Sequence, residues 1–450
     1  MIYKRHMWIP FQTTAPVPDD LGSVISIDSD AEVEPRAVGV DARALDSIWQ
    51  ALLQWYRSGI HPAIQICVRR NGEILLHRAI GYASGNGPGD PSGATKVRCT
   101  TQTPFNVFSA SKAVTAMVIH LLDQKRALHL DDHVCDYIPE FACHNKEWIT
   151  IRHLLTHRAG IPNVPPEAMR LDQLEDLPGI VRIMCDAKPI AHPGRQVMYH
   201  ALTGGFVLGE VVRRATGKTI GQILHAEIKT PLQMRWFSYG VRREALHQVA
   251  VNYFTGFPAL FPVSTMLERA LGVDFVNGVT MTNDPRFLLS EIPSGNLVAT
   301  AEELSRFYQL LLNQGDLNGA AIFEPRTIRR ATAEQSYFEL DSVLVLPFRY
   351  SMGFMLGAKW FSMYGPDTEH AYGHLGFTNI ISWADPERQI AASIMTSGKP
   401  ILYPALYYAW EILRQIGVAC GRETARHPQA STARGSKVRT LKPARVRSVK

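Results

Sequence analysis

Cysteine is scarce in this 450-residue chain, and no two cysteines are close in sequence. The six cysteines form no C-x-x-C motif; they are Cys67, Cys99, Cys135, Cys143, Cys185 and Cys420. Small disulfide-rich domains and structural zinc sites need closely spaced cysteines. The spacing argues against both and predicts reduced thiols.

Long apolar runs are also missing. The basic residues Lys4, Arg5 and His6 are followed by only a short apolar stretch, which Pro10 interrupts. A secretory signal needs a longer apolar segment, and a membrane-spanning helix needs about 20 apolar residues. We therefore expect neither, and a cytoplasmic location is the default prediction.

Several motifs of catalytic and nucleotide-binding proteins are absent. The chain has no G-x-S-x-G, which argues against a nucleophile elbow, and no G-x-x-x-x-G-K-[ST] phosphate-binding loop. The pairs His153 with His157 and His370 with His374 have a spacing compatible with a metal ion. No H-E-x-x-H glutamate or other carboxylate pattern accompanies them. The sequence therefore predicts no metal site and no cofactor.

A strong charge on the folded body is missing too. The formal net charge is +6, but residues 421–450 contain nine Lys or Arg and one Glu, a local charge of +8. The remainder is close to neutral, so we expect no specific nucleic-acid partner. The basic segment 419–450 has few apolar residues and is expected to be disordered. Contact of this segment with anionic lipid or another anionic surface is the alternative.

The composition that remains is that of a large globular protein, with 46% hydrophobic and 20% charged residues. Residues 1–40 lack periodicity and predict an irregular arm. The segments 41–102 and 335–418 carry helix and strand patterns, whereas 103–334 is mostly helical and includes an aromatic-rich insertion at 225–296. This order predicts an α+β fold: an antiparallel sheet flanked by terminal helices, with a mostly helical part inserted. A site at the boundary of the two parts is expected.

Individual elements can be predicted within this organisation. A helical stripe begins near Asp41 and ends at His61-Pro62. Two strand-like runs, 63–68 and 73–82, flank Asn71-Gly72, which is a strong hairpin signal. Other expected elements are helices near 149–155, 202–215, 301–312 and 403–416, and strands at 379–384 and 389–395 around a turn at 385–388.

Ser109 and Lys112 begin an apolar-striped segment. Apolar residues recur at helical spacing from Val114 to Leu122, so a helix is predicted from Ser109 to about Lys125. Lys112 then lies on the same helix face as Ser109 and within reach of its hydroxyl. The helix N-terminus offers free N–H groups and a positive dipole end, which favour negative charge on an oxygen. The pattern is typical of a serine activated by a lysine, with an ordinary helix cap as the alternative.

Over residues 41–418 the chain resembles the superfamily of serine β-lactamases, penicillin-binding proteins and family VIII (class C β-lactamase-like) carboxylesterases. The resemblance rests on Ser109-x-x-Lys112, on Tyr199-His200-Ala201 at the position of a Y-x-N element, and on His374-Leu375-Gly376 at the position of K-T-G. Shorter matches occur at 154–160, 231–234 and 294–300. The resemblance, strongest to the family VIII esterases, implies a β-lactamase/transpeptidase-like fold and a serine hydrolase that forms an acyl-enzyme on Ser109.

The residue types suit this chemistry. A serine nucleophile needs a proton acceptor, and Lys112 can accept only if its surroundings keep it neutral near pH 7. Tyr199 has an ordinary pKa of about 10 and can lose its proton beside a cationic lysine. The pair would then share one proton, and either partner can be named the base. The alternative for Tyr199 is a core residue with its hydroxyl at the edge.

The resemblance also implies an oxyanion hole, formed by the backbone N–H groups of Ser109 and Phe377. Gly376 is expected to leave room there for the substrate. His374 takes the place of the family's lysine and is expected to act as a hydrogen-bond donor near Tyr199. A merely structural strand histidine is the alternative.

Two features bear on the substrate. Ala201 stands where β-lactamases and penicillin-binding proteins carry the Asn of Y-x-N, and loss of that donor weakens selection for amides. The aromatic-rich run from Trp236 to Phe261 is a candidate lining for an apolar acyl or alcohol pocket, with core packing as the alternative. Together they favour a small-molecule carboxylic ester. Acyl transfer, hydrolysis of a peptide or β-lactam, and a non-catalytic scaffold stay open, and the oligomeric state is not predicted.

Overall fold

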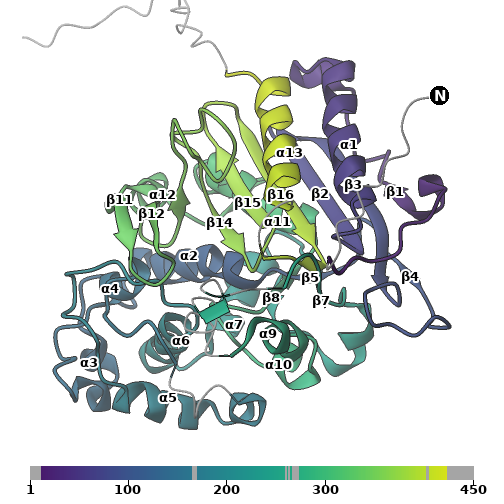
Figure 1. The fold of residues 1–450 in the computed structure, drawn as a ribbon. Helices are drawn as coiled ribbons and strands as arrows, with labels where there is room; N and C mark the ends of the chain where they lie inside the picture. Colours follow the sequence, from purple (N-terminus) through teal and green to yellow (C-terminus); the bar gives the residue numbers. More distant parts are fainter. Residues whose placement is uncertain are drawn as a thin grey trace, which may run out of the picture.

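A computed structural model provides the structure of the protein, and it describes residues 12–164, 170–258, 261, 264–265, 273–401 and 405–422. Its main feature is a sheet of ten strands with helices on both faces and a helical block below it (Figure 1). The path runs in the order β1 (Ile25–Ile27), β3 (Glu73–Ser84), β2 (Ala63–Arg70), β16 (Ile390–Thr396), β15 (Ile380–Asp385), β14 (Tyr372–Gly376), β13 (Met355–Leu356), β12 (Leu346–Tyr350) and β11 (Ser336–Asp341), and β4 (Val97–Arg98) pairs with β3.

All neighbouring strands of this sheet are antiparallel, and strands from both ends of the chain meet at β2 and β16. The α+β, β-lactamase/transpeptidase-like fold predicted from the sequence is therefore confirmed. The predicted hairpin joins β2 to β3. Its turn residues Asn71 and Gly72 have φ angles of 54° and 89°, the conformation that Asn-Gly adopts readily and that matches the twist of the strands.

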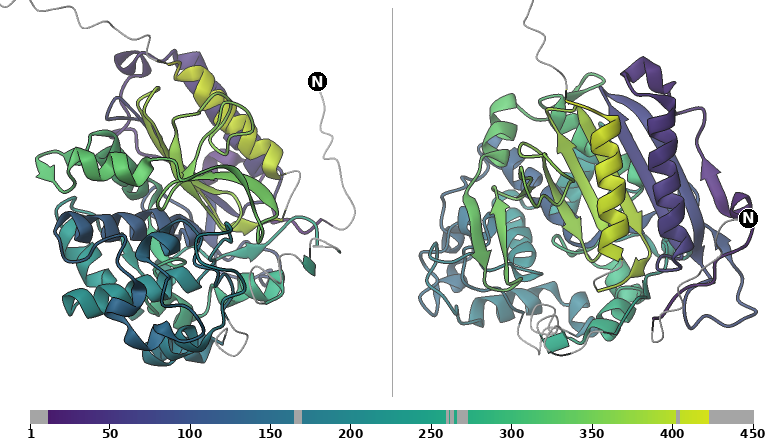
Figure 2. Two further views of the ribbon diagram at one scale, coloured as in Figure 1. Left: turned by 90° about the vertical axis from the view of Figure 1, so that its left-hand side faces the viewer. Right: turned by 45° about the horizontal axis from the view of Figure 1, so that its top comes forward.

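The terminal helices cover one face of the sheet. Helix α1 (Ala42–Arg57) packs beside α13 (Ala405–Ala419), and Figure 2 shows the two lying across the strands. Leu52 and Ile48 of α1 and Ile412 of α13 are fully buried against this face. The predicted helices at both ends of the fold are confirmed, with α13 extending three residues beyond the expected Ile416.

The opposite face packs on α11 (Ala301–Leu312), which contacts β2, β15 and β16. The sequence assigned this helix to the block 103–334, whereas the structure places it against the sheet. Thr300 fixes its start through a capping box, in which the hydroxyl accepts from the Glu303 N–H and the Glu303 carboxylate accepts from the Thr300 N–H. Amphipathic spacing predicts that a helix has a buried face but not which layer buries it.

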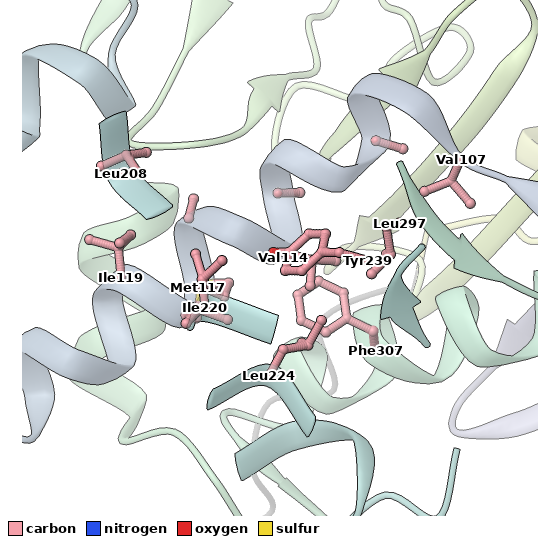
Figure 3. Close-up of a cluster of buried hydrophobic side chains, with 14 of the residues drawn as sticks. Val107, Val114, Met117, Ile119, Leu208, Ile220, Leu224, Tyr239, Leu297 and Phe307 are labelled. Carbon is pink, nitrogen blue, oxygen red and sulfur yellow. The ribbon is translucent and has the colours of Figure 1, made fainter. Parts of the chain in front are cut away.

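Helix α2 (Ser111–Gln124) lies at the centre of the molecule. Every residue from Ala113 to Leu122 is buried, so the helix has no solvent face over this stretch. Figure 3 shows Val114, Met117 and Ile119 in one cluster with side chains from other helices, among them Leu208, Ile220, Leu224 and Phe307. A helix buried on all sides holds its first turn rigidly, which matters because Ser109 lies just before it.

The helical block contains two further predicted helices, α4 (Ile151–Leu155) and α6 (Thr203–Thr216). Its helices that were not singled out in the sequence are α3 (Val134–Tyr137), α5 (Leu177–Asp186), α7 (Ile220–Leu224), α9 (Phe275–Met281), α10 (Pro285–Leu289) and α12 (Pro325–Thr332). A small sheet of β5 (Phe105–Asn106), β8 (Leu297–Ala299) and β6 (Ser238–Tyr239) lies between this block and the large sheet. Strands β7 (Tyr253–Phe254) and β17 (Gly398–Lys399) pair in parallel nearby.

The chain ends differ in part from expectation. The arm 1–40, predicted to be irregular, contributes β1 to the edge of the large sheet and buries Val24. At the other end, Cys420 is buried and the Gly421 carbonyl accepts hydrogen bonds from Arg70. The rest of the predicted disordered tail, from residue 423 onward, lies outside the described residues. No helix in the described ranges has the length and apolar character needed to cross a membrane.

Candidate active site

Ser109 lies in a short 3-10 helix (Phe108–Ala110) between β5 and α2, rather than in the first turn of one long α-helix as predicted. Phe108 before it has a φ of 51°, an uncommon conformation for a non-glycine residue. Local bonds hold it: the Phe108 N–H donates to Asn106 Oδ1 at 3.1 Å, and the Ser111 hydroxyl donates to the Phe108 carbonyl. Ser109 is thereby half-exposed between buried neighbours.

The Lys112 amine lies within hydrogen-bond distance of three oxygens. Nζ is 3.0 Å from Ser109 Oγ, 2.8 Å from the Ala201 carbonyl oxygen and 3.0 Å from the Ser294 carbonyl oxygen. A neutral amine has two N–H donors and one lone pair, and a carbonyl oxygen can only accept. Donation to the two carbonyls leaves the lone pair for the Ser109 hydroxyl. The geometry is that of a base beside its nucleophile.

Burial favours the neutral form of this amine. None of its three hydrogen-bond partners is a carboxylate, so nothing offsets the loss of water around a charged ammonium. Desolvation lowers the pKa of Lys112 to about 7. A lysine can act as a base near pH 7 only in its neutral form, and burial of Lys112 favours that form.

A pH dependence follows from this value. Below pH 7 the amine is mostly protonated and cannot accept the Ser109 proton, so we expect kcat/KM to rise as the pH increases through about 7. Steady-state ester hydrolysis across the neutral range, with reporter absorbance corrected for pH, measures this. An ascending limb near the ordinary carboxylate pKa of about 4 would assign the base to a different group.

Tyr199 lies beside the lysine, with Lys112 Nζ 4.8 Å from the centre of its ring. Burial, and to a lesser extent the charge of Asp341, raises the pKa of Tyr199 above its usual value, although the neighbouring Ser109 hydroxyl acts in the opposite direction. The phenol therefore keeps its proton at neutral pH. The sequence left either Lys112 or Tyr199 as the base, and the structure favours Lys112.

His374 on β14 is buried, and its ring centre is 6.4 Å from that of Tyr199. Nδ1 is 2.7 Å from the Leu375 carbonyl oxygen. Because that oxygen can only accept, Nδ1 carries the proton, and Nε2 of a neutral ring is an acceptor. Burial and the nearby Lys112 charge lower the pKa of His374 to about 3, so the ring stays neutral. The predicted donor is therefore directed to the backbone, not to Tyr199.

The end of β14 approaches the turn that carries Ser109. A Cβ on Gly376 would overlap the carbonyl oxygen of Val107, so glycine is needed for the strand to approach the chain before Ser109, and not only for substrate access. The next residue, Phe377, packs its ring 5.4 Å from that of Phe108 and 5.0 Å from that of Phe275. The oxyanion role of the Ser109 and Phe377 N–H groups stays a prediction that this proximity supports.

A cavity of about 140 Å³ opens beside Ser109. Its lining is mostly apolar and includes Phe108, Leu171, Leu174, Leu202, Phe206, Met281, Phe287, Ile292 and Phe377. Its polar members beside Ser109 are Arg170, Thr282 and Ser294. The elements that contribute to the lining include the 3-10 helices at 108–110 and 171–175, the start of α6, α9 and α10. None of the described aromatic residues between Trp236 and Phe261 is part of this lining. The apolar pocket exists, but the predicted lining is wrong: Trp236, Phe237, Tyr239 and Tyr253 are buried in the protein interior.

The sequence did not single out Asp341, which accepts a hydrogen bond from the Tyr199 N–H at 3.1 Å. The two residues are 142 positions apart, and no motif marks Asp341. The carbonyl of Ser294, by contrast, belongs to a segment that the family resemblance had marked. Among the described residues, no group of three or more His, Cys, Asp or Glu side chains is arranged to hold a metal ion.

A serine paired with a buried lysine of lowered pKa, at the junction of an antiparallel sheet and a helical block, defines a serine hydrolase of the β-lactamase superfamily. The sequence profile of the Beta-lactamase family matches residues 45–412, and the chain belongs to that family.

Known proteins agree with this assignment. The esterase/β-lactamase LipL of Mycobacterium tuberculosis is 27% identical over 303 residues, covering 64% of this chain and 68% of LipL. A penicillin-binding protein homologue from Caulobacter crescentus superposes with a TM-score of 0.71 at 25% identity, covering 85% of this chain and 99% of its own. A family VIII carboxylesterase structure superposes with a TM-score of 0.70 at 23% identity, covering 83% and 98%.

Proposed function

We propose that the protein is a carboxylesterase that forms an acyl-enzyme on Ser109. The observation that carries this proposal is the position of the Lys112 amine, whose two N–H groups face carbonyl oxygens while its lone pair faces the Ser109 hydroxyl. As Ser109 attacks the ester carbonyl carbon, its proton passes to Lys112. The N–H groups of Ser109 and Phe377 stabilise the negative charge that develops on the carbonyl oxygen.

Tyr199 completes the first half of the reaction. Its protonated phenol gives a proton to the departing alkoxide and regains one from Lys112, so the alcohol leaves neutral and the acyl group stays on Ser109. Water then attacks the acyl-enzyme, and the same groups return the serine to its starting state. An added alcohol or amine in place of water would give acyl transfer, which product analysis with competing acceptors detects.

Esters are preferred to amides for two reasons. Ala201 offers only a methyl side chain at the position of the amide donor of Y-x-N, and its carbonyl is used by Lys112. The adjoining pocket is mostly apolar, as suits an acyl or alcohol group without charge. LipL, described as an esterase/β-lactamase, and the family VIII carboxylesterase support this choice. A peptide or β-lactam substrate remains the second candidate because of the penicillin-binding protein homologue.

The test compares a p-nitrophenyl butyrate ester, the matching p-nitroanilide and a chromogenic cephalosporin under identical conditions. We expect kcat/KM for the ester to exceed the other two by about 100-fold or more, because no side-chain donor recognises the amide. Comparable turnover of the cephalosporin would instead favour β-lactamase activity for the same site.

Narrowing the pocket should change acyl-length preference. Leu174 lines the cavity on the short helix Leu171–Glu175, and we expect Leu174→Trp to lower kcat/KM for octanoate esters by about 10-fold or more while acetate esters change little. Gln173→Trp, a neighbouring residue outside the lining, is the matched control. Equal losses for both chain lengths would show that this cavity does not hold the acyl group.

A further inference from the structure

The loop that carries Tyr199 belongs to no helix or strand, so its backbone N–H groups need other acceptors. The N–H groups of three successive residues, 198–200, donate to acceptors on only two residues, His157 and Asp341. The N–H groups of Met198 and His200 donate to the carbonyl oxygen of His157 at 2.8 Å and to its Nδ1 at 3.2 Å. The N–H of Tyr199, between them, donates to Asp341 Oδ1 at 3.1 Å. Tyr199 itself is thus fixed through Asp341.

Asp341 is fully buried at the end of β11, and all of its hydrogen-bond donors are uncharged. Oδ1 also accepts from the N–H groups of Val343 and Leu344 at 2.9 and 3.1 Å, and Oδ2 accepts from the Tyr350 hydroxyl at 3.2 Å. Burying a carboxylate without a cationic partner is costly. Two of its bonds serve the turn after β11, but the bond from the Tyr199 N–H joins a segment far away in the sequence. The cost suggests a role in the site.

We propose that Asp341 is a positioning residue for catalysis, which holds the Tyr199 backbone so that the phenol meets Ser109 and Lys112. This inference rests on the proposed function, since it assigns Asp341 a role through Tyr199. Bonds to Val343 and Leu344 fix the carboxylate in the turn between β11 and β12, and the Tyr199 loop is then attached to that turn. Without the carboxylate, the backbone N–H of Tyr199 would lose its acceptor.

A second effect of the same carboxylate is electrostatic. Its negative charge disfavours a phenolate at Tyr199 and adds to burial in raising the pKa of that phenol. The residue thereby helps to keep Tyr199 as a proton donor while Lys112 acts as the base. Asp341 lies at the end of β11 in the large sheet, whereas Lys112 lies on α2 and Tyr199 on a loop. The fold brings these three residues together, in agreement with a positioning role for Asp341.

The test is a double-mutant cycle on ester hydrolysis with Asp341→Ala, Asp341→Asn and Tyr199→Phe. We expect Asp341→Ala to lower kcat/KM by about 10²-fold, the cost of a small misplacement of a catalytic group. Asp341→Asn keeps an acceptor oxygen and should stay within about 10-fold of wild type. In the Tyr199→Phe background, each Asp341 substitution should lower kcat/KM by a further factor of less than about 3, because Asp341 acts through Tyr199.

Ser342→Ala is the matched control, since it removes a neighbouring hydrogen bond to the Val197 carbonyl while leaving Asp341 in place. The kcat/KM of Ser342→Ala should stay within about 2-fold of the wild-type value. Additive losses in the cycle, or an equal loss in the control, would overturn the positioning role. If Asp341→Ala does not fold, the cycle with Asp341→Asn decides by the same criterion. If Tyr199→Phe itself costs nothing, the proposed role of Tyr199 fails instead.

Discussion

Replacement of Ser109 by alanine is expected to abolish ester turnover, with kcat/KM falling by about 10⁴-fold or more. The change removes the only atom that forms the acyl bond. The fold should be unaffected, because Ser109 Oγ has Lys112 and Tyr199 as its neighbours rather than a structural partner. Hydrolysis of a short-chain p-nitrophenyl ester, with circular dichroism to verify folding, measures the effect.

The control for this variant is Ser111→Ala, two residues away. Ser111 is buried, and its hydroxyl forms hydrogen bonds with the backbone of Phe108 and Leu297. Loss of this hydroxyl should therefore lower the free energy of unfolding while having a smaller effect on kcat/KM. A fluorophosphonate probe should label the wild type and the Ser111 variant but not Ser109→Ala. Undiminished turnover by Ser109→Ala would refute the nucleophile, and absence of labelling in the wild type would favour a non-catalytic scaffold.

Replacement of Lys112 by methionine is expected to lower kcat by about 10²- to 10⁴-fold, the range for loss of a positioned base. Methionine keeps the length and apolar stem of the side chain, so the cavity left by the amine is small. Lys112→Arg should not restore activity, because a guanidinium stays charged at every accessible pH and cannot accept the Ser109 proton.

Lys125→Met, at the other end of α2, is the comparison for this variant. Its amine forms an exposed ion pair with Glu227 and is remote from Ser109 in sequence, so turnover should be unchanged. Recovery of full activity in Lys112→Arg would contradict a neutral base and would point to a purely electrostatic role for the positive charge.

Local patterns in the sequence were sufficient for much of this account. The spacing of Ser109 and Lys112 predicted their contact, because a helical turn brings residues three apart to one face, and the observed separation is 3.0 Å. The turn at Asn71-Gly72 and the helix at 301–312 were likewise predicted from short-range preferences. Such features depend on neighbours in the chain, which a sequence displays directly.

Features that depend on distant segments were predicted less well. The hydrogen bond from Tyr199 to Asp341 joins residues 142 positions apart. Met281 and Phe287, which line the pocket, lie beyond the aromatic run that was one candidate lining. Composition and periodicity do not encode which layers of the fold will meet.

The most direct test of the account is intact-protein mass spectrometry after rapid mixing with a slowly hydrolysed ester, followed by peptide mapping. We predict a transient mass increase equal to the acyl group, located on Ser109, and its absence in Ser109→Ala. In Lys112→Met the adduct should form far more slowly. Turnover of the ester without any adduct, or an adduct on a different residue, would contradict an acyl-enzyme at this site.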